Sequence, residues 1–157
     1  MPNSEDKFRP NVCVLLYNPA FELLLGERLH DRGHWQFPQG GVDEGDELID
    51  SVVREIREEL GIERSCLGEI KKLSVTHSYV WTDIPEYAVG RWIGQSQTFW
   101  AVEFIGEDSD IDLTKDDTPE FQAWRWCSLE SIKEVAASKR WDGYEKAIKA
   151  FKAVIKE

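Results

Sequence analysis

The stretch GGVDEGDELIDSVVREIREELGI, residues 40–62, decides the fold, because an amphipathic helix can be read from it directly. Five apolar side chains recur at helical spacing and place one stripe against a core: Ile49, Val52, Val53, Ile56 and Leu60. Asp46 stands before this run as the expected N-cap residue. Gly61 follows it, where a left-handed glycine commonly ends a helix. The stretch therefore predicts one helix with a buried face.

The same helix carries three glutamates on one side. Glu55, Glu58 and Glu59 stand at i, i+3 and i+4, so at about 100° per residue they share a face that borders the apolar stripe. Like charges at such spacings cost about 0.2 to 0.5 kcal/mol per pair unless a counter-charge is present. In one interpretation Arg54 and Arg57 supply that charge on a solvated face. In the other a divalent cation does, since Mg²⁺ binds one or two carboxylates together with substrate phosphates.

The segment before the helix favours the cation. WQFPQGG, residues 35–41, contains Pro38 and the paired Gly40 and Gly41. Glycines at this place allow a tight loop whose backbone approaches phosphates and returns near the helix.

Composition bounds the class of protein. The 157 residues fit a single domain, 1–157, in which 41% of the residues are hydrophobic, enough to form a core. Lys and Arg number 19 against 30 Asp and Glu, a formal net charge of −11. Such a charge repels polyanions unless cations or a local basic patch intervene. We therefore expect a phosphate substrate to need metal, and no extended nucleic-acid groove.

Cysteine usage and hydropathy indicate the compartment. Cys13, Cys66 and Cys127 are an odd number without the spacing of a zinc site or a disulfide framework. MPNSEDKFRP at the N-terminus is polar, and no apolar run approaches the roughly 20 residues of a membrane helix. We expect a reduced, cytoplasmic protein that does not bind membranes.

The remaining periodicities predict strands and two more helices. NVCVLLY (11–17) and FELLLGER (21–28) form an expected hairpin around NPA. Further strands are expected at 68–81, 97–105 and 121–127, with an acidic loop at 106–120. Ser128 is the expected cap of a short helix reaching about Ser138, and 144–156 has helical spacing. The predicted class is α/β, with strands packed between helices.

A known family matches this pattern. Gly40, five residues, Asp46, seven residues and then REIREELGI closely resemble the Nudix box, G-x5-E-x7-R-E-U-x-E-E-x-G-U with U aliphatic, and Asp46 is the one departure. FRPNV, WQFPQGG, IGQSQTFW, TPEF, WRW and SKRWDGY are similar to segments of the bacterial RNA 5′ pyrophosphohydrolases and of the dinucleoside polyphosphate hydrolases. The resemblance implies the Nudix fold, a mixed β-sheet sandwiched between α-helices.

The resemblance also implies roles for individual residues. The expected metal ligands, for Mg²⁺ or Mn²⁺ in its place, are Glu55, Glu58, Glu59 and Glu120. The expected catalytic residues are Glu59, Glu58, Glu120 and Arg54, with Arg54 orienting the glutamates and Glu120 completing the metal site or acting as general base. The substrate-binding residues that it implies are Arg9, Arg28, Lys139 and Arg140, which contact phosphates, and Trp81, which stacks on a base. Gly40 and Gly41 join this expected set through the glycine loop described above.

One segment departs from the family. Ser138 stands where the relatives have Phe or Tyr directly before the Lys-Arg pair, and Trp141, three positions later, is a candidate to replace that ring.

The sequence thus predicts a metal-dependent Nudix pyrophosphohydrolase that cleaves polyphosphate bridges of RNA 5′-triphosphate ends and of dinucleoside polyphosphates. Two alternatives stay open. One is an enzyme chiefly for diadenosine tetraphosphate with no RNA role. The other is a noncatalytic module that only binds nucleotides, although degenerate boxes mark that class and this box is nearly complete.

Overall fold

The computed structural model describes residues 7–155. The strands are β1 (Phe8–Tyr17), β2 (Leu23–Arg28), β3 (Trp35–Gln36), β4 (Gln39–Gly41), β5 (Leu67–Val80), β6 (Gly94–Phe104) and β7 (Phe121–Cys127). The α-helices are α1 (Leu48–Leu60), α2 (Ile132–Val135) and α3 (Trp141–Ile155). Residues 1–6 and 156–157 lie outside the described residues, and with them the polar start of the chain, both ends of the expected domain and the last residue of the expected C-terminal helix.

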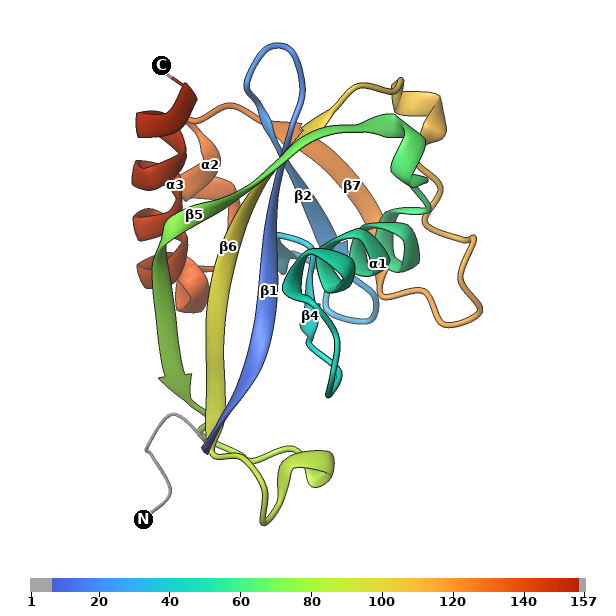
Figure 1. The fold of residues 1–157 in the computed structure, drawn as a ribbon. Coiled ribbons are helices and arrows are strands. Elements are labelled where there is room, and N and C mark those ends of the chain that lie inside the picture. The colour runs from blue at the N-terminus through green and yellow to red at the C-terminus, as the bar shows by residue number, and fades with distance from the viewer. Residues whose placement is uncertain (1–6, 156–157) are drawn as a thin grey trace.

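The strands form one mixed sheet. Its main order is β3-β2-β1-β6-β5, while β4 pairs with β1 and β7 pairs with β2. β1 runs parallel to β6 along its whole length, and the other strand pairs are antiparallel (Figure 1). The expected mixed sheet is confirmed.

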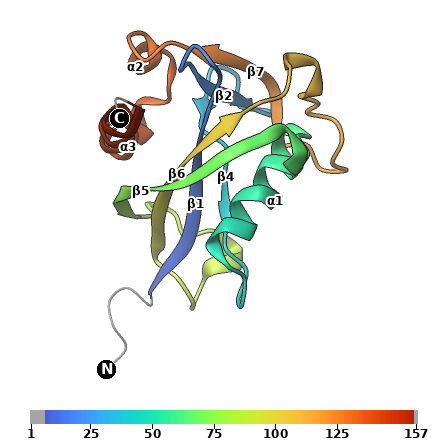
Figure 2. The same ribbon diagram turned by 45° about the horizontal axis from the view of Figure 1, so that its top comes forward.

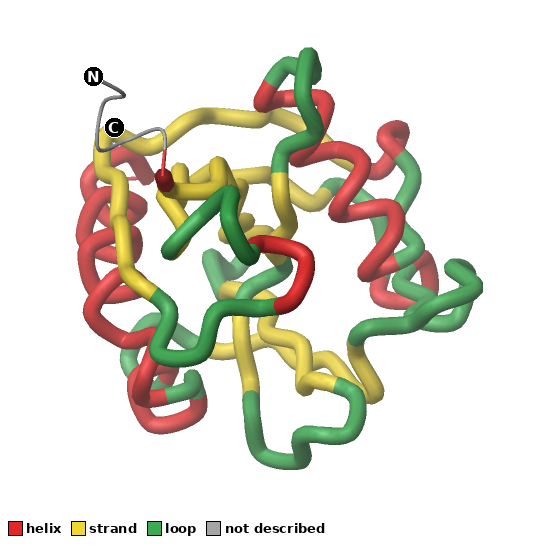
Figure 3. The backbone as a smooth tube through the Cα atoms, turned by 90° about the horizontal axis from the view of Figure 1, so that it is seen from below, coloured by secondary structure: helices red, strands yellow, loops and turns green. Residues whose placement is uncertain are grey.

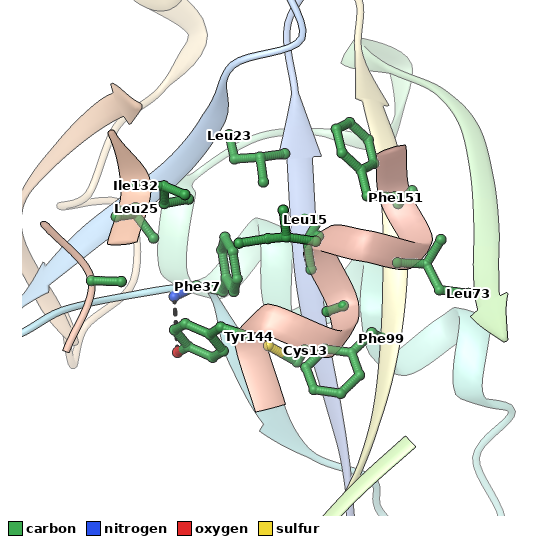
Figure 4. Packing of buried hydrophobic residues seen from close by; sticks show 14 of the residues in the cluster. Cys13, Leu15, Leu23, Leu25, Phe37, Leu73, Phe99, Ile132, Tyr144 and Phe151 are labelled. Carbon is green, nitrogen blue, oxygen red and sulfur yellow. Dashed lines mark hydrogen bonds between the residues drawn. The ribbon is translucent and has the colours of Figure 1, made fainter. Parts of the chain in front are cut away.

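Helices cover both faces of the sheet, as seen in two further views (Figures 2 and 3). β1 explains why, since its central residues are buried without a break and alternate between two cores. Val12, Val14 and Leu16 pack in the cluster that contains Val52 and Ile56 of α1. The opposite side of β1 packs in the cluster of α3 (Figure 4), which includes Cys13, Leu15, Tyr144 and Phe151.

A buried hydrogen bond adds to the apolar packing on the α3 side. The backbone N–H of Phe37 donates to the hydroxyl of Tyr144 at 3.2 Å (Figure 4), and the two rings lie 4.4 Å apart. This contact fixes the chain just before β4 against α3. β4 then pairs with β1 through Asn11↔Gly41 and Cys13↔Gln39. The glycine segment is therefore an ordered strand between β1 and α1.

Most expected elements are confirmed. Tyr17 pairs with Leu23 in the β1–β2 hairpin, and β7 occupies the expected residues. The helix of the opening stretch ends at Gly61, whose φ of 67° is left-handed as predicted. Among the described residues no helix is both long and apolar enough to span a membrane.

Three local predictions were wrong. The N-cap of α1 is Glu47, without a side-chain cap, and Asp46 binds Arg54 instead. Ile49 is 38% exposed, whereas Ser51 is buried, because the buried face of α1 is rotated toward the glutamates. The short helix α2 begins after Ser131, whose backbone N–H donates to the Ser128 hydroxyl, so Ser128 is one turn too early to be its cap.

Candidate functional site

The carboxylate cleft lies between α1 and the edges of β1, β4 and β6. It has a volume of about 370 Å³. Its lining residues come from five separate segments of the chain: Arg9, Asn11, Gln39, Gly40, Gly41, Asp43, Arg54, Glu55, Glu58, Gln95 and Glu120. The fold thus brings most of the predicted metal, catalytic and glycine residues to one place.

Two of the glutamates are buried. Glu55 is 8% exposed and Glu59 is 2% exposed, whereas the side chain of Glu58 is 43% exposed at the cleft. Burial, with the nearby Glu58 and Glu120 charges, raises the pKa of Glu55 to about 7. Burial and the charges of Glu120 and Glu55 raise the pKa of Glu59 well above its ordinary value. Without a cation, the fold therefore opposes ionisation of this pair.

The donor set fits a hard divalent cation. Both carboxylate oxygens of Glu59 are buried and make no hydrogen bond of good geometry among the described residues, although the Gln39 backbone and the Glu55 side chain lie near enough to affect the pKa of Glu59. A buried carboxylate without partners is costly, and a bound cation offsets that cost. Within residues 7–155 no three His, Cys, Asp or Glu side chains form a ready-made metal cluster. An open carboxylate set suits Mg²⁺ or Mn²⁺, which keep waters and bind substrate phosphates as well.

Arg54 connects this face of α1 to the preceding loop. Its Nη1 donates to Asp46 at 2.8 Å and to Asp43 at 3.1 Å, and its Nη2 donates to the Gly41 carbonyl at 3.0 Å. The same guanidinium lies 3.6 Å from Glu55 Oε1 and 3.8 Å from Glu58 Oε1. Arg54 is thus placed to orient both glutamates.

The paired glycines leave room for charged side chains. A Cβ at Gly40 would overlap the Glu55 carboxylate, and one at Gly41 would overlap the Arg9 guanidinium. Their small size is therefore required by packing across the cleft, in addition to the predicted approach of the backbone to phosphates.

Glu120 reaches the cleft from the end of the acidic loop, directly before β7. Its backbone carbonyl accepts a hydrogen bond from Leu29 N–H at 2.8 Å, which fixes the end of the acidic loop beside β2. Arg28, predicted to contact phosphates, is exposed at the end of β2 and does not line this cleft.

A second depression, the basic cleft, contains three of the predicted substrate-binding residues, Trp81, Lys139 and Arg140. It has a volume of about 330 Å³ and is lined by His77, Tyr79, Val80, Trp81, Thr82, Gln97, Lys139 and Arg140. The Arg140 guanidinium lies 5.0 Å from the centre of the Tyr79 ring. Trp141 does not line this cleft, because its indole N–H donates to Glu145 and its ring packs against the α3 cluster. The idea that Trp141 replaces the missing ring beside Ser138 is therefore wrong.

Amide side chains separate the two clefts. Gln97 Nε2 donates to Gln39 Oε1 at 2.9 Å and to Asn11 Oδ1 at 3.2 Å, and the Tyr79 hydroxyl donates to Gln95 Oε1 at 2.6 Å. The sequence patterns did not predict a role for these residues. The only signal was their spacing, since residues two apart in a strand share a face, and Ser96 and Thr98 beside them are polar as well.

Comparisons with known proteins agree with this geometry. The NUDIX domain model matches residues 7–151. An RNA pyrophosphohydrolase of Wolbachia pipientis wMel is 34% identical, over 99% of this chain and 96% of its own length. An RNA pyrophosphohydrolase of Caulobacter vibrioides (strain NA1000 / CB15N) is 37% identical, over 91% of this chain and 85% of its own.

A solved structure shows the same fold. The C. elegans Ap4A hydrolase, in a binary complex, superposes with a TM-score of 0.65 at 23% identity, covering 94% of this chain and 97% of that one. The match of the family model over nearly all of the chain, and relatives above 30% identity, confirm the expected family and class of enzyme. The chain belongs to the Nudix family of hydrolases.

Proposed function

We propose that this Nudix hydrolase, which acts on phosphoanhydride bonds, is a single-domain, metal-dependent pyrophosphohydrolase. Its proposed substrates are triphosphorylated RNA 5′ ends and dinucleoside polyphosphates. The observation that carries the proposal is the buried Glu59, whose two oxygens lack hydrogen-bond partners among the described residues. It shares a helix face with Glu55, which lines a cleft that also contains Arg9. A cation and a chain of phosphates together supply the charges that this arrangement lacks. The names of the bacterial relatives support the RNA substrate.

Four glutamates would bind Mg²⁺, or Mn²⁺ in its place: Glu55, Glu58, Glu59 and Glu120. When bound, the metal neutralises phosphate charge and lowers the pKa of a water. Arg54 orients Glu55 and Glu58 by its contacts to the loop and to both carboxylates. Glu58 and Glu120 are the candidates to accept the proton of the attacking water, because their side chains line the open cleft. Glu59 is not among these candidates, because it is buried and does not line the open cleft.

The basic cleft supports a second contact with the substrate. Lys139 and Arg140 offer positive charge beside Trp81 and Tyr79, and the hydrogen-bonded amides of Gln39 and Gln97 link this cleft to the cleft of the glutamates. We assign phosphate contact to Lys139 and Arg140 and base stacking to Trp81. Recognition restricted to the terminal nucleotides suits a chain whose net charge of −11 disfavours long polyanions. Its three free cysteines suit a reducing, cytoplasmic compartment.

The test compares two substrates in parallel. The protein is incubated with Mg²⁺ and either 5′-triphosphorylated RNA or diadenosine tetraphosphate, and rates and products are measured. We expect release of pyrophosphate or phosphate from RNA and cleavage of the dinucleotide, both abolished by EDTA. Failure to cleave either substrate would contradict the proposal. Cleavage of diadenosine tetraphosphate alone would limit the enzyme to dinucleoside polyphosphates.

A further inference from the structure

Arg9 is the cation of the carboxylate cleft that has no ionic partner. The cleft contains Asp43 and three glutamates, yet within residues 7–155 no carboxylate lies within 4.0 Å of the Arg9 guanidinium. Its Nε is buried and has no hydrogen-bond partner there. By contrast, Arg54, the other arginine of the cleft, contacts four carboxylates. The positive charge of Arg9 is therefore available to an anion.

Two aromatic rings determine where this guanidinium lies. Arg9 Cζ is 4.9 Å from the centre of the Tyr87 ring and 5.5 Å from the centre of the Trp92 ring. Both distances are within the range of cation–π contacts, which attract a guanidinium without neutralising it. Both rings belong to residues 81–93, the segment between β5 and β6 at the bottom of Figure 1.

Backbone contacts fix the positions of Arg9 and of the segment 81–93 that carries the two rings. Ile93 N–H donates to the Lys7 carbonyl at 2.8 Å, and Arg9 pairs with Gln95 in the parallel β1–β6 register, so the loop is tied to the start of β1. On the other side, the guanidinium lies against Gly41, where a Cβ would overlap it. Arg9 is thus confined between the rings and β4, beside the glutamates.

We propose that Tyr87 and Trp92 are positioning residues that present the Arg9 guanidinium to a substrate phosphate. An ion pair with a cleft carboxylate would fix Arg9 equally well, but it would neutralise the charge that the phosphate needs. Aromatic rings fix the side chain and leave its N–H donors free. The inference rests on the proposed function in one respect, namely that the ligand of the cleft carries several phosphates.

The first test measures binding rather than turnover. Affinity for inorganic tripolyphosphate with Mg²⁺ is determined by calorimetry in the Glu59→Gln background, where turnover does not intervene. We expect Trp92→Leu and Tyr87→Leu each to weaken binding by about threefold to tenfold, the range expected for a lost cation–π contact, and Trp92→Phe to restore most of it. In an Arg9→Ala background, Trp92→Leu should have no further effect.

Arg91 offers a matched control. Its guanidinium lies 4.0 Å from the centre of the same Trp92 ring but does not line the cleft, so Arg91→Ala should leave tripolyphosphate binding unchanged. If Trp92→Leu is too unstable to purify, Tyr87→Leu decides, because Tyr87 is 57% exposed. The inference would be overturned if the ring substitutions weakened tripolyphosphate binding equally with Arg9 and with Arg9→Ala, or if they did not weaken it at all.

Kinetics on the otherwise native enzyme give a second readout. Trp92→Leu should raise KM for diadenosine tetraphosphate while kcat stays within about twofold, since neither ring lines the carboxylate cleft. Coupling between Arg9 and Trp92 in tripolyphosphate binding, without hydrolysis of either substrate, would support the inference and contradict the proposed function. Hydrolysis of either substrate, without coupling between Arg9 and Trp92, would support the proposed function and contradict the inference.

Discussion

Arg54 Nη1 lies 2.8 Å from Asp46 Oδ2, so the carboxylate that precedes α1 binds the arginine that faces the glutamates. Asp46 stands where the Nudix box has Glu. Its shorter side chain still reaches Arg54, which also donates to the Gly41 carbonyl. We therefore infer that Asp46 holds Arg54, and through it Glu55, in place.

Removing this contact should reduce activity without unfolding the protein. Asp46→Ala should lower kcat/KM for diadenosine tetraphosphate by about tenfold, because residues that orient a metal site typically contribute 10- to 100-fold. Asp46→Glu restores the family residue and should retain activity. Asp43→Ala is the matched control, since Asp43 contacts the same nitrogen at 3.1 Å but is 70% exposed, and its effect should be smaller. Full activity in Asp46→Ala would refute this role.

Substitution of Glu59 should reduce turnover without reducing the stability of the metal-free protein. Glu59→Gln removes a buried carboxylate that has no hydrogen-bond partner among the described residues, so the melting temperature without metal at pH 8 should not fall. Turnover should fall by at least about 100-fold, because the variant lacks an anionic ligand. The control, Glu63→Gln, changes an exposed glutamate just after α1 and should alter neither quantity. Turnover near the native level in Glu59→Gln would remove Glu59 from the ligand set.

The core and half of the site could be predicted from local patterns. Alternation along β1 and the helical period of α1 predict which residues are buried, because burial follows the period of the element. The spacing of Glu55, Glu58 and Glu59 likewise places them on one face. Ile49 shows the limit of this reasoning, since the pattern does not tell which edge of the apolar stripe is covered, and β4 covers the edge with the glutamates.

The other half depends on contacts between distant segments. Arg9 and Trp92 are 83 positions apart and meet only because β1 and β6 run parallel in register. Likewise, sequence could not show that Gly41 makes room for Arg9, or that Trp141 turns toward Glu145 and away from the basic cleft. Such relationships are set by sheet register and loop path, which no short motif encodes.

Without metal, stability should fall as the pH rises. Burial and neighbouring carboxylates raise the pKa of Glu55 to about 7 in the folded protein, above its ordinary value of 4.5, and also raise that of Glu59. Between pH 4.5 and about pH 7 the folded protein binds more protons than the unfolded chain. A rise in pH through this window therefore lowers the free energy of unfolding. In EDTA the melting temperature should drop by several degrees from pH 5 to pH 7.5, and the double variant Glu55→Gln, Glu59→Gln should show a smaller drop.

Added Mg²⁺ should reverse this trend. Metal ligands must be deprotonated, so the stabilisation by Mg²⁺ should be larger at pH 7.5 than at pH 5. A metal-free melting temperature that rises steadily over this window, in the native protein and the double variant alike, would contradict the raised pKa values.

The paired glycines should give two different defects. The Cβ of Gly40→Ala would displace the Glu55 carboxylate, so this variant should need a higher Mg²⁺ concentration for half-maximal activity. The Cβ of Gly41→Ala would displace the Arg9 guanidinium, so this variant should raise KM for diadenosine tetraphosphate and leave the Mg²⁺ requirement unchanged. We expect about a tenfold effect in each case, measured by Mg²⁺ titration at saturating substrate and by substrate titration at saturating Mg²⁺. Because the two positions are adjacent in β4, general damage to the strand would produce the same profile in both variants, whereas opposite profiles require separate contacts with metal ligand and phosphate ligand.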